Sequence, residues 1–255
     1  MRRADAWLGI LPFAALVTGW WMLAHSGRFS AATLPAPESV VAAAQDLASR
    51  GSLLPDILGS LTRLALGATV SIVTGVGLGI LTGLNRYLAD LLLPLAGFFS
   101  AVSGIAWIPL AITWFGLGTA AVTFVIWNSI FFLVFFNTVL GIRSVPRIME
   151  QAIRTLGGSY FILIWQVFLP GALPHIVSGI RSGLGFGWRA LVAAELIAAT
   201  NGLGFLIFDA SHFFRTDEIL VGIATIGILW VIMDGVLLAP LERRTIQRWR
   251  TVVEP

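Results

Sequence analysis

Long runs of hydrophobic residues without a formal charge dominate the chain and predict membrane-spanning helices. About 20 residues of helix cross a hydrocarbon core of about 30 Å. The stretch 91–142 contains no charged residue and is long enough for two such helices, with a turn at 114–118 where two glycines lie close together. Six spans are therefore predicted, at 6–24, 64–84, two within 91–142, 178–199 and 219–241.

The first span and the polar segment that follows it each have a distinct pattern. The first span follows two arginines, as in a signal peptide, but it is long and no small-residue cleavage site follows, so we expect an uncleaved anchor. Between 25 and 56 the chain is more polar, and Val40, Ala44 and Leu47 form a helical stripe. This stripe fits a helix at the membrane surface as well as a helix packed within a loop.

The segment 155–180 has no charged residue and is long enough for a seventh span. The positive-inside rule argues against it, because without it ten arginines lie in the cytoplasm against three outside, and with it seven against six. Gly157-Gly158, Pro170 and Pro174 also divide the segment into short pieces. We expect two short cytoplasmic helices whose apolar face is covered by a partner protein.

Composition excludes several classes of protein. Hydrophobic residues make up 57% of the chain and charged residues only 11%, which is too little polar surface for a soluble domain. Every basic residue is arginine, so the chain has no Schiff-base lysine and no Walker A lysine and is not itself a P-loop ATPase. Cysteine is absent and the three histidines are scattered. No catalytic residue, metal site or cofactor is therefore predicted.

One motif between the fourth and fifth spans points to a family. Gln151-Ala152-Ile153 is followed after three residues by Gly157, after nine more residues by Val167, and after one more residue by Leu169-Pro170. This spacing resembles the EAA loop of permease subunits of ATP-binding-cassette (ABC) importers, in which Glu-Ala-Ala is followed by Gly, Ile and Leu-Pro. Gln151 and Ile153 depart from that pattern, although Glu150 lies one position earlier.

Other segments extend this resemblance over most of the chain, to the nitrate, sulfonate and taurine group of such permeases. They are Leu34-Pro35-x-Pro37, Ser60-Leu61-x-Arg63-x3-Gly67, the run 169–174, Trp188, Ala194-Glu195 and Gly202-Leu203-Gly204. The resemblance implies an all-α polytopic fold of the type I importer kind with six transmembrane helices. It divides the chain into an anchor and surface helix at 1–57, a permease core at 58–245 with a coupling loop at 143–174, and a tail at 246–255.

The resemblance also implies the partners and the location of the chain. A cytoplasmic ATP-binding subunit, in two copies, would contact a helix of the coupling loop, and its closure around ATP would switch the path between inward-facing and outward-facing. The residues implied in this contact are Glu150, Gln151, Ala152, Arg154, Gly157, Leu169 and Pro170. The other implied partners are a second permease copy, membrane lipid and an extracytoplasmic binding protein docked near 201–218, but no nucleic acid. The chain would lie in a bacterial inner membrane with both termini cytoplasmic.

Charged residues within spans are functional candidates because each costs about 2.5 to 3.5 kcal/mol on insertion scales. Glu195 and Arg189 lie six positions apart and do not share a helix face, so we expect no direct pair between them. Arg189 is expected in a structural ion pair, with contact to an anionic substrate as the alternative. Arg63 and Arg181 are expected to extend to the membrane interface, and Asp234 to pair near Arg243-Arg244. The candidate residues of the substrate path are Arg189, Glu195, Trp188 and Arg63.

Two spaced rows of glycine predict close helix packing, within the chain or between two copies. They are Gly75, Gly79 and Gly83 in the second span, and Gly179, Gly183 and Gly187 in the fifth.

The function predicted from the whole sequence is the permease subunit of an ABC importer for a small anion of the sulfonate, taurine or nitrate kind. A secondary transporter or channel without an ATPase is the alternative, and a membrane enzyme is disfavoured because no His, Asp or Glu cluster converges on a loop.

Overall fold

The computed structural model describes residues 3–30 and 32–240, and within them the secondary structure is entirely helical. This confirms the all-α prediction. In chain order the elements are α1 (Arg3–His25), α2 (Pro37–Ser49), α3 (Leu53–Leu84), α4 (Arg86–Ser100), the 3-10 turn η1 (Gly104–Trp107), α5 (Ile108–Phe115), α6 (Thr119–Arg143), α7 (Arg147–Thr155), α8 (Tyr160–Leu163), the π-helical η2 (Ile164–Phe168), α9 (Leu169–Ala198), α10 (Leu203–His212), α11 (Thr216–Met233) and the π-helical η3 (Asp234–Leu238).

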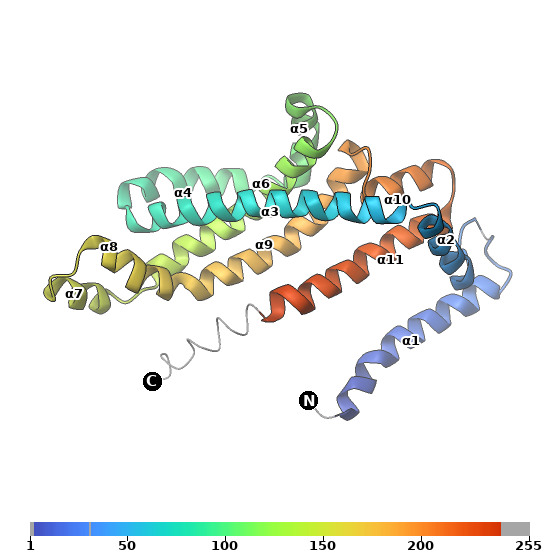
Figure 1. The fold of residues 1–255 in the computed structure, drawn as a ribbon, viewed down its shortest axis with the longest axis horizontal. Helices are drawn as coiled ribbons and strands as arrows, with labels where there is room; N and C mark the ends of the chain where they lie inside the picture. Colours follow the sequence, from blue (N-terminus) through green and yellow to red (C-terminus); the bar gives the residue numbers. More distant parts are fainter. Residues whose placement is uncertain (1–2, 31, 241–255) are drawn as a thin grey trace.

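Helix α6 is the centre of the fold and runs between α3 and α9 (Figure 1). Both neighbours approach it along the glycine rows seen in the sequence, which therefore pack within the chain. A Cβ on Gly79 would lie 2.5 Å from Thr138 Cβ, and one on Gly187 would lie 2.5 Å from Ile130 Cδ1. The close approach completely buries a row of α6 side chains at a spacing of four residues. They are Val122, Ile126, Ile130 and Val134.

Four helical stretches are long and apolar enough to cross a membrane. They are Leu53–Leu84, Thr119–Arg143, Tyr160–Ala198 and Thr216–Leu238. A fifth crossing would be made by the bent pair of α4 with η1 and α5. The predicted first span at 6–24 falls within the 23 residues of α1, and the count of six stays a prediction.

The third predicted span is not one straight helix, which corrects the prediction. The turn before α6 is found where it was expected, but α4 ends at Ser100 and the chain bends by 86° before Gly104–Phe115. Gly104 packs directly on Ser129 of α6, where a side chain would not fit. Pro109 then opens α5 in its first turn, a position where its missing N–H costs nothing.

The segment 155–180 also differs from the prediction of two short helices. Helix α7 is short and ends before Gly157 as expected, but the chain then runs as one helical stretch from Tyr160 to Ala198. Pro170 and Pro174 lie inside it. The π-helical η2 ends two residues before Pro170, and η3 likewise ends two residues before Pro240. A wider turn accommodates the missing donor and the ring, so proline here reshapes the helix without ending it.

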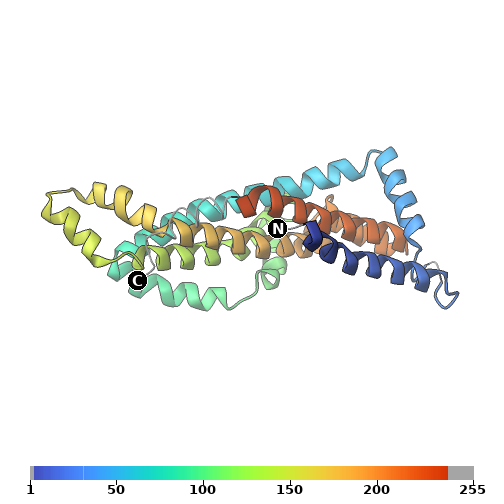
Figure 2. The ribbon, with the colours of Figure 1, turned by 90° about the horizontal axis from the view of Figure 1, so that it is seen from below.

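The N-terminal part of the chain joins the bundle through α2 (Figures 1 and 2). Trp21 Nε1 of α1 donates to Glu38 Oε1 of α2 at 2.7 Å. The face of α2 that contains Leu47 packs against Leu206 of α10 and Val221 of α11. The helix is therefore packed on the bundle, and its position at the membrane surface stays a prediction.

Candidate functional site

Arg63 and Glu195 form a buried ion pair between α3 and α9. Arg63 Nη1 lies 2.7 Å from Glu195 Oε1, and the two side chains are 4% and 0% exposed. Ser60 Oγ donates to the same carboxylate at 2.7 Å from Oε2, and Arg63 Nη1 also donates to the Asn201 carbonyl at 2.8 Å. A low-dielectric interior tolerates charges that are paired and hydrogen-bonded in this way. The pair therefore fixes α3 against α9.

The same carboxylate also holds the start of α10. Gly204 N–H donates to Glu195 Oε2 at 3.0 Å, and Gly202 N–H donates to Asp56 Oδ1 at 2.8 Å. The first N–H groups of a helix have no partner within it and favour negative charge. Gly202 has φ +112°, and a Cβ there would lie 2.6 Å from Glu195 Oε1, so the turn requires glycine. Three helices are thus joined at one point, far from α7 (Figure 1).

The prediction that Arg63 and Arg181 extend to the membrane interface is wrong. Helix α3 begins at Leu53, so Arg63 lies about three turns inside it. Arg181 lies within α9, and its Nη2 is 3.1 Å from Asp234 Oδ1 at the end of α11. Asp234 was expected near Arg243 and Arg244, which lie outside the described residues.

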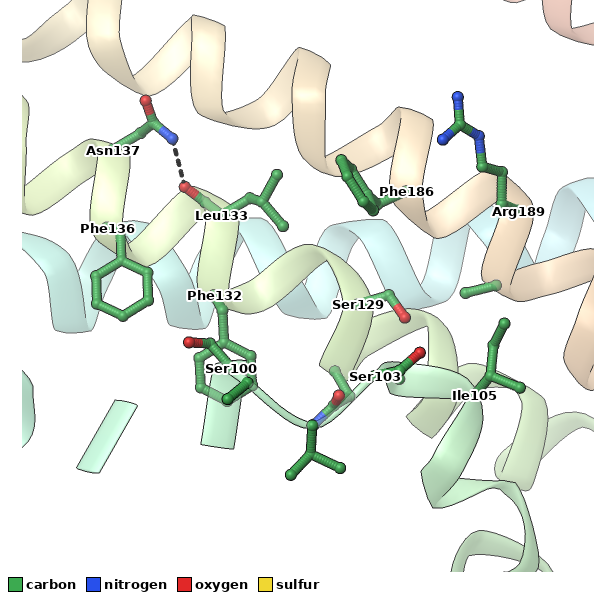
Figure 3. Close-up of a pocket in the computed structure, with 15 residues that line it drawn as sticks. Ser100, Ser103, Ile105, Ser129, Phe132, Leu133, Phe136, Asn137, Phe186 and Arg189 are labelled. Carbon is green, nitrogen blue, oxygen red and sulfur yellow. Dashed lines mark hydrogen bonds between the residues drawn. The ribbon is translucent and has the colours of Figure 1, made fainter. Parts of the chain in front are cut away.

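A cavity of about 610 Å³ opens between α6, α9 and the bend that follows α4. Its polar side chains come from the bend (Ser100, Ser103), from α6 (Asn128, Ser129, Asn137) and from α9 (Arg189). Figure 3 shows the oxygens of Ser103 and Ser129 near one another, with Arg189 at the rim and its guanidinium directed away from them. Asn137 is occupied, since its Nδ2 donates to the Leu133 carbonyl at 2.8 Å.

A second cavity of about 530 Å³ lies along α9 on the side of α11. Arg189 and Phe186 line both cavities, so Arg189 stands at the boundary between them. Its Cζ lies 5.7 Å from the centre of the Phe186 ring, a cation–π contact that positions the guanidinium. Within the described part of the chain, no carboxylate pairs with Arg189, and the expected ion pair stays a prediction.

The exposure of Arg189 shows which surface of α9 avoids lipid. It is an exposed residue within the apolar stretch Tyr160–Ala198, nine residues before its end, and an arginine facing hydrocarbon is strongly disfavoured. This face must therefore meet water or protein. A guanidinium presents several donors in a planar fork that matches the oxygens of an anion, whereas the hydroxyls of Ser100 and Ser129 already donate to the Gly97 and Val125 carbonyls. The two cavities together are suited to a small anion.

The predicted coupling residues separate into two groups. Glu150, Gln151, Ala152 and Arg154 lie on α7, which has no buried residue and projects at one end of the molecule (Figure 1). Gly157 ends α7 with φ +77°, as a left-handed cap does, and Gly158 N–H donates back to the Ile153 carbonyl at 2.9 Å. Leu169 and Pro170 instead begin α9.

Apolar side chains are exposed on and beside α7. The exposed fraction is 70% for Ile148 and 83% for Leu156, and Phe161 and Trp165 of the following helix are exposed as well. The Glu150–Arg154 ion pair, at 2.8 Å, stabilises the helix that presents them. A patch of this kind on a projecting helix is typical of a protein contact surface.

Of the four residues predicted for the substrate path, only Arg189 lies at either cavity. Arg63 and Glu195 form the buried pair, and Trp188 is 5% exposed with its ring centre 6.1 Å from that of Trp230. Sequence reasoning missed the polar residues of the first cavity. Asn128 and Ser129 were detectable as polar side chains inside a long uncharged run.

Several apolar membrane-length helices, and an exposed arginine within one of them that borders two cavities, define the class as a polytopic membrane transport protein. The chain belongs to the family described as "binding-protein-dependent transport system inner membrane component", whose model matches residues 75–243. It is a multi-pass permease of the inner membrane.

Two relatives match almost the whole chain. The taurine transport system permease protein TauC of Escherichia coli is 38% identical over 93% of this chain and 88% of its own length. The putative aliphatic sulfonates transport permease protein SsuC of Bacillus subtilis is 33% identical over 99% and 91%. A structure of the methionine ABC transporter MetNI in an inward-facing conformation contains a chain with the same fold, with a TM-score of 0.62 and 16% identity over 81% of this chain and 98% of that one.

Proposed function

We propose that this chain forms the transmembrane path of an ABC importer for a small sulfonate-type anion, with Arg189 as the residue that contacts the anion. The observation that carries the proposal is the position of Arg189, which is exposed within a span, borders both cavities and has no carboxylate partner among the described residues. A bound anion would supply the missing negative charge. The printed names of the relatives support the anion class, because taurine and aliphatic sulfonates share a sulfonate group.

The energy for transport would come from partner subunits. Family membership supports a cytoplasmic ATP-binding subunit and an extracytoplasmic binding protein. The exposed apolar face of α7 is the surface we assign to the ATP-binding subunit, and the helical stretch from Tyr160 to Ala198 would carry its motion across the membrane. The binding protein would dock on the opposite side, where α10 meets α11. We further propose two permease copies with two ATP-binding subunits.

Reconstituted transport tests the role of Arg189. The complex with its ATP-binding subunit and binding protein should take up [³⁵S]taurine or [³⁵S]ethanesulfonate only with ATP. Arg189→Gln should lower uptake at least about tenfold at unchanged assembly, since the charge-assisted contact to the anion is lost. Arg86→Gln is the matched control, because Arg86 is 91% exposed and pairs only loosely with Asp90. Equal uptake by Arg189→Gln and Arg86→Gln would refute the assignment.

The same preparation distinguishes the alternative class. A chain that catalyses uptake alone, without ATP and without an ATP-binding subunit, would be a secondary transporter or channel. Substrate-stimulated ATP hydrolysis by the assembled complex would support the importer instead.

A substitution at Gly157, which has a left-handed backbone conformation after α7, tests the proposed coupling surface. Gly157→Val should abolish uptake and stimulated ATP hydrolysis without preventing insertion, because valine is strained at φ +77° and the turn after α7 would move. Gly27→Val is the control, since Gly27 has φ +71° and equally open surroundings but lies after α1. Normal coupling in the Gly157→Val complex would argue against the assignment of α7.

A further inference from the structure

The second cavity contains a polar stripe that leads from Arg189 toward the cytoplasmic end of α9. Ser178, Ser182, Gly185 and Arg189 all line this cavity and follow one another at spacings of four, three and four residues, which places them on one face of a helix. The glycine row of α9 faces α6 instead. One surface of α9 thus serves packing, and another offers small and polar side chains along the membrane normal.

A second guanidinium lies on this stripe. Arg181 lines the same cavity, eight residues and about 12 Å along the helix from Arg189. Its Nη2 donates to both oxygens of Asp234, at 3.1 and 3.3 Å. The two side chains are 36% and 32% exposed, so the ion pair borders open space and is not sealed in the core. The two arginines differ in this respect, because Arg189 has no carboxylate partner within the described residues.

We propose that Arg181 is a second anion site on the path and that the Asp234 carboxylate occupies it until a transported anion takes its place. This inference rests on the proposed function, because it extends the path that begins at Arg189. An anion that leaves Arg189 along the stripe meets Arg181 next, and its sulfonate oxygens would replace the carboxylate oxygens on the same guanidinium donors. The Asp234 carboxylate competes with the anion for the Arg181 guanidinium, which we call the inner site. Binding at this inner site is therefore weak, and release toward the cytoplasm is fast.

Counting bound anions on the purified full-length chain in nanodiscs tests the proposal. With [³⁵S]ethanesulfonate as the probe, the unmodified chain should bind one anion, and this binding should be lost in Arg189→Gln. Asp234→Asn removes the competing carboxylate and should add a second anion with an affinity within about tenfold of the first, or about 1.4 kcal/mol. The double variant Arg181→Gln with Asp234→Asn should return to one.

The outcomes separate the two proposals. Failure of Arg189→Gln to remove the first anion would refute the proposed role of Arg189 and leave the inner site to be judged by Asp234→Asn. The inner site is refuted if Asp234→Asn binds no additional anion, or if the additional anion persists without Arg181. Asp209→Asn is the matched control, because it removes a half-exposed carboxylate that also pairs with an arginine, Arg215 at 3.1 Å, on the opposite side. It should leave the count at one.

A second measurement keeps Asp234 intact, in case its neutral variant does not fold. The chain has no native cysteine, so Ser182→Cys gives a single thiol on the stripe beside Arg181. In an Arg189→Gln chain, ethanesulfonate at a concentration far above that used for counting, where it displaces the Asp234 carboxylate from Arg181, should slow the reaction of this thiol with the anionic reagent MTSES several-fold. An unchanged rate would overturn the inner site.

Discussion

At the scale of single residues, the structure places charge in the membrane interior in two ways. Arg63 and Glu195 are buried with each other and with neutral hydrogen-bond partners, so their role is to join helices. Arg189 is exposed to a cavity, and its charge remains available to a ligand. The difference lies in the partners and not in the residue type, because both arginines lie within membrane-spanning helices.

The buried pair leads to a prediction about stability. Glu195→Gln should lower the thermal midpoint of the detergent-solubilised chain strongly, because it leaves Arg63 buried without a countercharge, a loss of about 3 to 5 kcal/mol for pairs of this kind. The control Asp209→Asn breaks a half-exposed pair and should cost about 1 kcal/mol or less. Thermal unfolding followed by size-exclusion chromatography measures both. Equal midpoints for the two variants would contradict the structural role of Glu195.

At the scale of elements, the fold depends on how closely α3 and α9 approach α6. Glycine rows on both neighbours remove the side chains that would separate the helix axes, so backbone and short side chains come into contact along α6. Such packing is sensitive to a single methyl group at the contact and insensitive to one elsewhere on the same helix.

Two glycines of α3 that lie on opposite faces of the helix test this sensitivity. Gly79→Ala should destabilise the chain by about 1 to 3 kcal/mol, because its Cβ would lie 2.5 Å from Thr138 Cβ. Gly77→Ala has nothing within 4 Å and should be neutral or stabilising by up to about 1 kcal/mol from helix propensity. The thermal midpoints of the two variants provide the comparison. A destabilised Gly77→Ala chain together with a normal Gly79→Ala chain would contradict the packing of α3 on α6 through Gly79.

At the scale of the whole molecule, the two ends of the bundle have different character. One end presents α7 and the exposed apolar side chains beside it, and the other presents α2, α10 and the joined network of Glu195 (Figures 1 and 2). The positive-inside rule predicts that the α7 end faces the cytoplasm, because Arg143, Arg147 and Arg154 lie at that end.

Single cysteines in this cysteine-free chain test the orientation. Ser159→Cys follows α7, and Ser211→Cys lies in α10, and both positions are exposed. An impermeant thiol reagent should label Ser211→Cys in intact spheroplasts and Ser159→Cys only in inverted vesicles. The reverse pattern would place α7 outside and end the proposed contact with a cytoplasmic ATPase.

Local pattern was sufficient for some features of the fold and site and insufficient for others. The turn at Gly157 was predictable because a left-handed helix cap favours glycine, and the row of Gly75 to Gly83 was predictable because glycine spacing reports a packed helix face. The start of α3 was misplaced because Arg63 ends the uncharged run 64–84, although Glu195 balances its charge inside the helix bundle.

Features that depend on distant partners could not be read from the sequence. The misplaced start of α3 put Arg63 at a helix end, and its true partner Glu195 is 132 positions away. The continuity of α9 was missed for a related reason. Pro170 is a breaker in an isolated helix, but a π-helical turn before it and packing around it keep the helix continuous.

That continuity has a mechanical consequence. From Tyr160 to Ala198 the chain forms a strut of 39 residues, about 58 Å long, whose one end adjoins α7 and whose other end contains Glu195. If α7 is the ATPase contact that we propose, a push on the first end would reach α3 and α10 with no intervening loop to absorb it. The widened turn in the strut, Ile164–Phe168, lies near the end that adjoins α7, so under this proposal the stiffness of those five residues would set how much of the motion reaches Glu195.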